Sequence, residues 1–313
     1  MVNTSAEAFA PATVANLGAG FDILGLALCE PGDIVRAERR PEPGAVIVHI
    51  DGDQGLLPRD PQKNTACVAA NETLRLLGVS EGVALTLHKG LPLASGLGSS
   101  AASAVAAAVA VNALHDQRLS LAELMPACLA GEAAVSGWHA DNVAPCLLGG
   151  IQLVAGLSLD TIRRLPTPAS LFLALVTPEV SVPTAMARAV LPQTVSLRDM
   201  VSQTAAVARL IDALYRGDLA ALGAAMEQDS VIEPARCHLM PLLSEVRTAA
   251  RAAGALGLVI SGAGPTLCAV CDSDEQARRV AQAMGAVYDA AGVGSVVHVS
   301  PVAERGAQVL NIQ

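Results

Sequence analysis

The sequence predicts a two-domain α+β protein, and three observations support that fold class. The chain has 313 residues, which suits two domains of about 150 residues each. Its composition, 52% hydrophobic and 16% charged, excludes an intrinsically disordered chain. Residues 171–299 contain predicted strands and helices in the order β-α-β-β-α-β, once the first helices are counted as one layer. That order is ferredoxin-like, and we place the two domains at residues 1–160 and 161–313.

The first domain opens with strands and leads to a glycine-rich loop. Apolar runs over residues 21–28 and 45–50, separated by Gly, Pro and Asp, predict short strands. A helical pattern over residues 62–77 and an alternating strand over residues 83–88 come next. Glycines over residues 90–98 then predict a loop, so a strand runs into a glycine loop.

Helices dominate the rest of the first domain. An alanine-rich helix is predicted over residues 99–114, directly after the glycine loop. Ser120 and Glu123 have the spacing of a capping box and predict another helix start. We expect Pro126 to shorten or kink that helix, which should end by residue 136.

A short helix beginning near Asp141 and a strand over residues 150–155 complete the first domain. Residues 156–170 collect Pro, Thr and Ser and predict the linker between the domains. Beyond it we expect strands at 171–177, on both sides of 261–266 and at 294–299, and helices near 183–191, 196–214, 218–229, 240–253 and 274–291.

Charge and composition exclude several functional classes. Twenty basic against twenty-nine acidic residues give a net charge of −9, which argues against a nucleic-acid partner. The longest apolar run, residues 101–114, is shorter than the roughly 20 residues that span a bilayer, and residues 1–7 lack the features of a leader. We therefore expect a cytoplasmic protein that acts on small polar molecules, without a membrane partner.

The seven cysteines lie in apolar stretches, as reduced core residues do. Cys268 and Cys271 form a C-x-x-C pair, but in a strand their side chains point to opposite faces. A metal site is therefore not expected there.

The glycine loop carries the most informative motif of the chain. Residues 92–102 read Pro92-Leu93-Ala94-Ser95-Gly96-Leu97-Gly98-Ser99-Ser100-Ala101-Ala102. Two glycines before a helix allow close backbone approach to a ligand, and the helix N-terminus supplies unpaired N–H groups that bind phosphate.

Three interpretations of this loop compete on the sequence alone. A Walker A loop fails because no lysine follows Gly98. A dinucleotide-binding fingerprint is weak because the helix leads into another helix instead of a strand ending in an acid. A plain turn in which Ser99 or Ser100 caps the helix stays open.

The same residues resemble the P-x3-G-L-G-S-S-A-A motif of the GHMP small-molecule kinases. Residues 10–22, which read APATVANLGAGFD, are similar to the family's N-terminal motif, and residues 261–266, SGAGPT, to its third motif. Residues 139–145, HADNVAP, followed by residues 148–150, LGG, are most similar to the homoserine kinases within that superfamily. The resemblance runs from residue 9 to residue 268, in the family's order.

The resemblance implies an N-terminal domain of the ribosomal-protein-S5 type, a ferredoxin-like C-terminal domain and an active site between them. It implies ATP as phosphoryl donor, bound by residues 92–102, with Asn64 and Lys89 near the adenine and ribose. It also implies Mg²⁺, held by Ser100 and Glu132 with Ser99 as neighbour or alternative. A hydroxyl and a carboxylate are oxygen ligands that suit this ion.

The resemblance further implies L-homoserine as substrate, an amino acid with an ammonium and a carboxylate group. Such a zwitterion requires an acid and one or two arginines. The matching positions are Asn16 and Asp22 at the amino end, Thr184, Arg188 and Arg236 at the carboxylate end, and His139 and Gly262 as further lining residues. Each of these has an ordinary structural alternative, such as a surface ion pair for a single arginine.

Asn142 occupies the position at which several relatives carry a catalytic aspartate. The family pattern suggests that Asn142 orients the attacking hydroxyl, so that no strong general base is needed. Asp141 is the alternative base, although it also suits the N-cap of the next helix.

The function expected from this resemblance is phosphorylation of the L-homoserine side-chain hydroxyl, in threonine biosynthesis. The enzymatic alternative is a kinase for another small alcohol, such as a mevalonate-type substrate without an ammonium group. The alternative from another class is a non-catalytic ligand sensor. A homodimer is a further expectation from the family.

Overall fold

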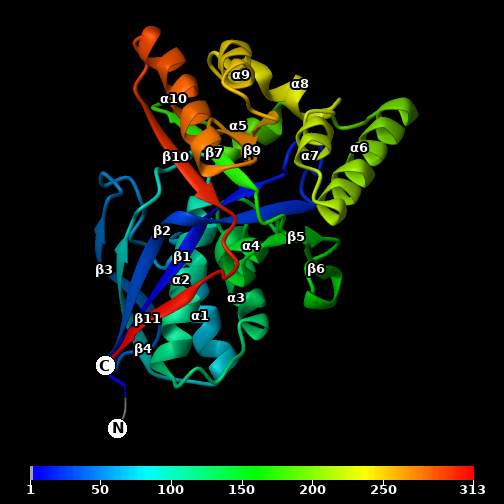
Figure 1. Cartoon of the computed structure of the whole chain (residues 1–313). Helices are drawn as coiled ribbons and strands as arrows, with labels where there is room; N and C mark the ends of the chain where they lie inside the picture. The colour runs from blue at the N-terminus through cyan, green and yellow to red at the C-terminus, as the bar shows by residue number, and fades with distance from the viewer. Residues whose placement is uncertain (1–2) are drawn as a thin grey trace.

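The computed structural model describes residues 3–313 and contains two β-sheets flanked by helices (Figure 1). Met1 and Val2 lie outside the described residues. They belong to residues 1–7, the segment from which we predicted the lack of a leader. Among residues 3–313, no helix combines the length and the apolar character needed to cross a membrane.

The first sheet has seven strands. They are β1 (Ser5–Ala15), β2 (Leu24–Arg40), β3 (Ala45–Asp51), β4 (Gly82–His88), β5 (Ile151–Val154), β6 (Ile162–Leu165) and β11 (Gln308–Ile312). Its main order is β11-β1-β2-β4-β3, and β5 pairs with both β2 and β6. All pairs are antiparallel except β3 with β4, which are joined by helix α1.

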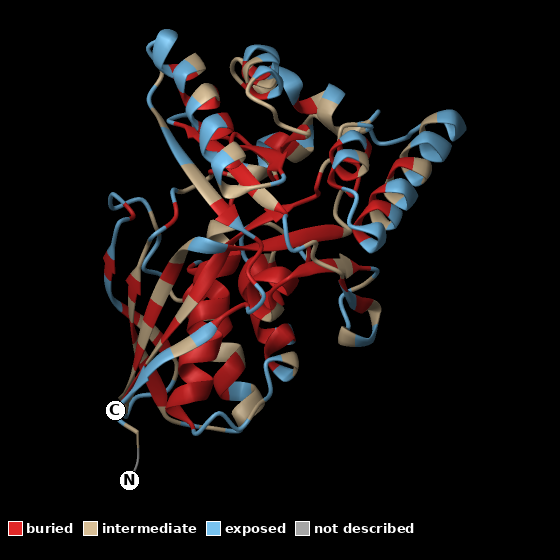
Figure 2. Cartoon of the chain, viewed as in Figure 1, coloured by how far each residue is buried: buried red, intermediate tan, exposed pale blue. Residues whose placement is uncertain are grey.

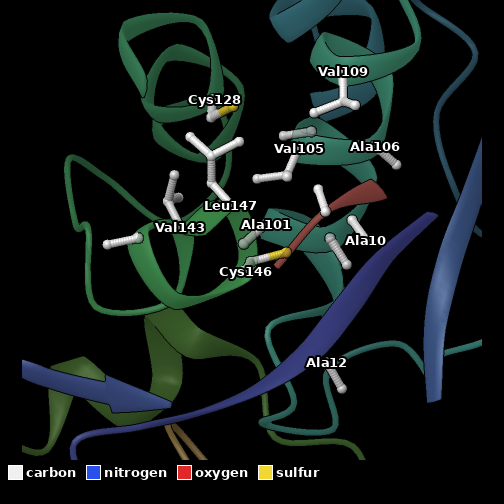
Figure 3. Close-up of a cluster of buried hydrophobic side chains, with 14 of the residues drawn as sticks. Ala10, Ala12, Ala101, Val105, Ala106, Val109, Cys128, Val143, Cys146 and Leu147 are labelled. Atoms are coloured by element: carbon white, nitrogen blue, oxygen red, sulfur yellow. The ribbon is translucent and has the colours of Figure 1, made fainter. Parts of the chain in front are cut away.

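The helices of the first half are α1 (Thr65–Leu77), α2 (Ser99–Leu114), α3 (Met125–Ala133) and α4 (Val143–Leu148). Helix α2 lies at their centre, in contact with β1, β2, α1, α3 and α4. Every residue from Ala101 to Leu114 is buried, as the continuous red of α2 in Figure 2 shows. Small side chains let β1 and α4 approach this helix closely: Ala10 of β1 and Cys146 of α4 lie near Ala101 of α2 (Figure 3).

The second sheet is formed by β7 (Phe172–Pro178), β8 (Gly257–Ile260), β9 (Leu267–Cys271) and β10 (Ser295–Pro301). Its order, β10-β7-β9-β8 with all pairs antiparallel, confirms the ferredoxin-like arrangement. Helices α9 (Leu243–Ala252) and α10 (Asp274–Ala290) cover one face. Helices α6 (Leu197–Arg216) and α7 (Leu219–Met226) lie on the other.

Alternation along β9 divides the core of the second half. Cys271 belongs to the cluster beneath α9 and α10, whereas Cys268 belongs to the larger cluster that continues into the first half of the chain. The two cysteines therefore face opposite sides of the sheet, as the strand pattern predicts.

Several predicted boundaries were wrong, and tertiary pairing explains them. Strand β2 continues through its Pro and Gly residues, because its first part pairs with β5 and its last part with β4. The predicted linker contains β6, which pairs with β5. The last strand, β11, was not predicted and joins the edge of the first sheet beside β1 (Figure 1). A short helix, α8 (Ile232–Arg236), was also missed.

Two local expectations were also wrong, and a third was confirmed. Pro126 lies in the first turn of α3, where its missing N–H costs nothing, so it starts this helix instead of kinking it. Asn142, not Asp141, occupies the N-cap position of α4. The capping box is formed, because the Glu123 carboxylate accepts from the Ser120 N–H and the Ser120 hydroxyl accepts from the Glu123 N–H.

The close packing of α2 predicts that enlarging one of its alanines destabilises the fold. Ala106→Leu inserts extra volume into a fully buried position and should lower the free energy of unfolding by about 1–3 kcal/mol. Urea denaturation measures this effect. Ala286→Leu, the same change at an exposed position of α10, is the control and should be nearly neutral. Equal stability of both variants would contradict the packing described here.

Candidate functional site

A cleft of about 340 Å³ brings together segments from both halves of the chain. Among the predicted site residues, its lining includes Asn16, Asp22, Asn64, Lys89, Leu93, Ala94, Ser95, Gly96, Gly98, Ser99, Ser100, Glu132, His139, Asn142, Thr184, Arg188, Arg236 and Gly262. Four predicted nucleotide-binding residues do not line it. Pro92 is exposed, and Leu97, Ala101 and Ala102 are buried in the core, where they support the loop from behind.

The glycine loop is pressed against the third motif. A Cβ at Gly96 would collide with the carbonyl oxygen of Ser261, and Gly96 has a φ of 81° that favours glycine. The Ser261 hydroxyl donates to the Gly96 carbonyl oxygen at 2.7 Å, and the Thr266 N–H donates to the Ser95 carbonyl oxygen at 3.1 Å. The third motif therefore braces the loop.

The N-terminus of α2 has no side-chain cap. Gly98 occupies the N-cap position with a φ of 66°, so Ser99 and Ser100 lie in the first turn and the capping interpretation of these serines was wrong. The Ser99 hydroxyl is buried without a partner. The first N–H groups of α2 and the positive end of its dipole therefore face the cleft without a competing side-chain acceptor.

A buried ion pair beneath the loop fixes its start. The Lys89 ammonium group contacts the Asp33 carboxylate and donates to the Ser99 carbonyl oxygen at 3.0 Å and the Ser103 hydroxyl at 2.9 Å. Asp33 also accepts from the N–H groups of Gly90 and Leu91. All three ammonium donors are thus used by protein atoms.

Asp33 and Ser103 were not predicted as site residues from the sequence. The four-residue spacing of Ser99 and Ser103 on α2 could have indicated that they share a helix face.

Asn64, which also lines the cleft, has a similar structural role. Its side-chain oxygen caps α1 by accepting from the N–H groups of Ala66 and Cys67, and its nitrogen donates to the Pro58 carbonyl oxygen at 2.8 Å. The segment that includes Leu57 and Pro58 forms an apolar wall of the cleft.

Glu132 and Ser100 place a carboxylate and a hydroxyl group side by side, and both have oxygen atoms that can bind a metal ion. Glu132 is buried, and this burial raises its pKa, although hydrogen bonds from Ser100 and Ser136 oppose the shift. Its Oε2 atom is buried and lacks a hydrogen-bond partner.

No group of three or more His, Cys, Asp or Glu side chains that could hold a metal occurs among residues 3–313. Magnesium in kinase sites needs fewer protein ligands, because phosphate oxygens and water supply the rest. The unpartnered oxygen of Glu132 beside the Ser100 hydroxyl fits such an ion.

Asp141 and Asn142 differ sharply in their surroundings. Asp141 is buried, and burial, together with the charges of Asp22 and Glu132, raises its pKa to about 7. Its Oδ1 atom has no partner. The Asn142 side-chain oxygen accepts from the Thr13 hydroxyl at 2.6 Å, and the hydrogen bonds of residues 3–313 leave its nitrogen without a protein acceptor. The amide N–H groups of Asn142 are therefore available to the cleft.

Charged residues from both halves of the chain gather at one end of the cleft. Arg188 donates to both carboxylate oxygens of Asp22, at 3.1 and 2.8 Å, so the acid and the base predicted for a zwitterion neutralise each other. His139 Nδ1 lies 3.6 Å from Asp22, and the pKa of this imidazole is lowered by burial and by Arg188. Thr184 lies at the start of α5 (Thr184–Ala189), the helix that carries Arg188.

Arg236 and Phe21 complete this end. Arg236 is only 2% exposed and donates to the carbonyl oxygens of Ala187 and Gly262, both at 3.0 Å. The guanidinium carbons of Arg188 and Arg236 lie 5.5 and 5.1 Å from the centroid of the Phe21 ring. Phe21 was not predicted as a site residue, although it adjoins Asp22 in the N-terminal motif.

Asn16 holds the loop that carries Phe21 and Asp22. Its side-chain oxygen accepts from the Asp22 N–H at 3.0 Å, and its nitrogen donates to the Gly262 carbonyl oxygen at 2.9 Å. Asn16 and Asp22 have φ values of 74° and 60°, which are unfavourable for residues other than glycine. The cross-link through Asn16 stabilises this conformation and ties the loop to the third motif.

Known proteins agree with this arrangement. Residues 64–150 match the model of the GHMP kinases N terminal domain, and residues 210–290 match that of the GHMP kinases C terminal. The homoserine kinase of Chlorobium phaeobacteroides (strain BS1) is 39% identical, covering 96% of this chain and 98% of its own. That of Arabidopsis thaliana is 43% identical, covering 99% and 86%.

Solved structures show the same relationship. The crystal structure of homoserine kinase from Cytophaga hutchinsonii has a TM-score of 0.94 and 42% sequence identity to this chain, and covers 99% of this chain and 98% of its own. With relatives of this identity along nearly its whole length, the chain belongs to the GHMP kinase family and, within it, to the homoserine kinases.

Proposed function

We propose that the chain catalyses ATP-dependent phosphorylation of the side-chain hydroxyl of L-homoserine, giving O-phospho-L-homoserine for threonine biosynthesis. One observation carries this proposal beyond the family relationship. The same cleft contains the uncapped N-terminus of α2 at the glycine loop and the cluster of Asp22, Arg188 and Arg236. A phosphate site and a zwitterion site therefore lie side by side.

The nucleotide would lie along the glycine loop. Backbone N–H groups at Gly96, Gly98 and the first turn of α2 would bind the phosphates, and the apolar wall near Asn64 would accept the adenine and ribose. Lys89 would contribute through the shape of the loop, because its donors are used by Asp33, Ser99 and Ser103.

Ser100 and Glu132 would hold Mg²⁺, with the Ser99 hydroxyl nearby. When bound, this ion neutralises charge on the transferred phosphoryl group and its leaving group. Glu132 accepts a hydrogen bond from Ser100, in the first turn of α2, and lies near enough to Arg188 for that charge to oppose the rise in its pKa that burial causes. Their oxygen atoms, one of them buried and unpartnered, support this assignment.

The substrate would replace the contact between Asp22 and Arg188. Its ammonium group would face the Asp22 carboxylate, and its carboxylate would face Arg188 and Arg236, with Thr184 nearby. A molecule with both charges compensates both side chains at once. A mevalonate-type substrate would leave Asp22 without a cation, so the cluster favours an amino acid.

Asn142 would donate its amide N–H to the attacking hydroxyl oxygen and orient it toward the phosphorus. The Thr13 hydroxyl holds the amide in the required orientation. In a loose transition state, positioning and charge neutralisation carry most of the catalysis, so a strong general base is not needed. The bond between the γ-phosphorus and the β,γ-bridging oxygen of ATP would break as the homoserine oxygen bonds to that phosphorus. ADP would leave, and the hydroxyl proton would pass to an oxygen of the transferred phosphoryl group.

ADP release with a panel of alcohols tests the proposed function. We expect rapid ADP formation with L-homoserine and at least about a hundredfold lower kcat/KM with L-serine, L-threonine and mevalonate, which lack either the chain length, the primary hydroxyl or the ammonium group. Preference for mevalonate would indicate the other kinase class. ADP formation with none of the four would favour the ligand sensor.

Replacing Glu132 tests the metal assignment. Glu132→Gln should lower kcat by about a hundredfold or more while the melting temperature stays the same or rises, since the buried carboxylate is costly without its ion. Glu275→Gln on the exposed surface of α10 is the matched control. An unchanged kcat for Glu132→Gln would reject the metal role.

Separate replacement of Asp141 and Asn142 shows whether catalysis depends on an orienting amide or on a general base. We expect Asn142→Ala to lower kcat about a hundredfold, and Asp141→Asn to lower it much less. If Asp141→Asn abolished turnover in a folded protein and Asn142→Ala did not, the roles would be reversed.

The pH dependence of stability provides a second measurement on Asp141. Its pKa rises from about 3.8 in the unfolded chain to about 7 in the folded protein, so the folded state binds the extra proton between these values. Stability due to this group therefore falls as the pH rises from about 4 to 7. Asp141→Asn should be more stable than the wild type at pH 8, and this gain should disappear near pH 4. Urea denaturation at both pH values measures it.

A further inference from the structure

We propose that Phe21 is a specificity-determining residue, which holds the guanidinium groups of Arg188 and Arg236 in position for the substrate carboxylate. This inference rests on the proposed function and deepens it. It predicts that Phe21 sets the preference for an amino alcohol that carries a carboxylate over one that does not.

The geometry places both arginines on one aromatic ring. The guanidinium carbons of Arg188 and Arg236 lie within 5.5 and 5.1 Å of the Phe21 centroid, inside the range of cation–π attraction. Phe21 itself is only partly buried and lines the cleft. The ring therefore contacts both cations at the position where a substrate would meet them.

The two positive guanidinium groups of Arg188 and Arg236 repel each other, so a favourable contact is needed to keep them together. Arg236 is almost fully buried, and its desolvation and the nearby Arg188 charge both disfavour its cationic form. The negative face of an aromatic ring offsets part of this repulsion without adding a formal charge. A carboxylate in place of Phe21 would do the same but would compete with the substrate for the arginines.

The contact between Arg188 and Asp22 would not persist once the substrate binds. Asp22 binds Arg188 through both carboxylate oxygens in the structure described here, but the substrate ammonium group would draw on that same carboxylate. The Nε atom of Arg188 is buried and unpartnered. When Asp22 turns to the substrate, the Phe21 ring remains as the contact that keeps Arg188 beside Arg236.

Arg236 is held by two backbone carbonyl oxygens. Its donors reach the carbonyl oxygens of Ala187 and Gly262, which belong to α5 and to the third motif. Phe21 thus connects a rigidly held arginine with one on a short helix. Its removal should loosen the carboxylate site without disturbing the glycine loop.

The experiment compares ligands with and without a carboxylate. Steady-state kinetics of Phe21→Leu would give KM and kcat for L-homoserine and KM for ATP. Competitive inhibition constants would be measured for L-2-aminobutyrate, which has both charges, and for 3-aminopropan-1-ol, which has only the ammonium group. Phe21→Tyr keeps an aromatic ring, and Phe172→Leu makes the same change outside the cleft.

We expect Phe21→Leu to raise KM for L-homoserine and the inhibition constant of L-2-aminobutyrate about tenfold. The kcat value, KM for ATP and the inhibition constant of 3-aminopropan-1-ol should stay within about threefold of the wild type. Phe21→Tyr should restore binding of L-homoserine, and Phe172→Leu should leave all these constants unchanged.

Equal weakening of both inhibitors would overturn the inference, because the ring would then be only an apolar wall. Failure of Phe21→Tyr to restore binding, or an unchanged KM in Phe21→Leu, would also overturn it. Absence of L-homoserine phosphorylation by the wild type would instead reject the proposed function itself.

Discussion

The contact between the glycine loop and the third motif is the constraint on which the rest of the site depends. Glycines at 96 and 262 let two backbones from different halves of the chain approach closely, and Ser261 closes the contact by donating to the Gly96 carbonyl oxygen. The Gly262 carbonyl oxygen then accepts from Asn16 and Arg236. One junction thereby sets the distance between the backbone amides of the glycine loop and the charged cluster.

Asp22 and Arg188 form an ion pair inside the cleft that a charged ligand could replace. Asp22 and Arg188 satisfy each other in the structure, so neither is left as an isolated charge, and both stay accessible because each is only partly buried. Under the proposed function, a zwitterion would replace this internal contact with two external ones, which would keep the number of unpaired charges low throughout binding. At Glu132 and Asp141, in contrast, burial raises the pKa of the carboxyl group. The neutral, protonated form of each is therefore favoured unless a cation lies beside it.

Local patterns predicted the parts of this structure that local sequence controls. Helix α2 begins and ends where its alanine-rich run predicts, and the β-α-β-β-α-β order gives the observed second sheet. The strands β6 and β11 could not be predicted, because they are short and are defined by their partners β5 and β1. In the same way, motifs indicated Asp22 and Arg188, but only the fold shows that they form a pair across 166 positions of sequence. Asp33, Thr13 and Phe21 act through such long-range contacts. Thr13 and Phe21 lie in the N-terminal motif, but the motif does not show which distant residues they contact.

A crystal structure with L-homoserine and a non-hydrolysable ATP analogue is the most direct measurement of the central claim, that one cleft holds both ligands. We expect the phosphates against the backbone amides at Gly96, Gly98 and the start of α2, and the homoserine ammonium and carboxylate groups at Asp22 and at Arg188 with Arg236. The homoserine hydroxyl oxygen should then lie about 3–3.5 Å from the terminal phosphorus. Ligands bound in separate regions, or a hydroxyl group turned away from the phosphate, would contradict the proposal that one cleft holds both substrates for direct transfer.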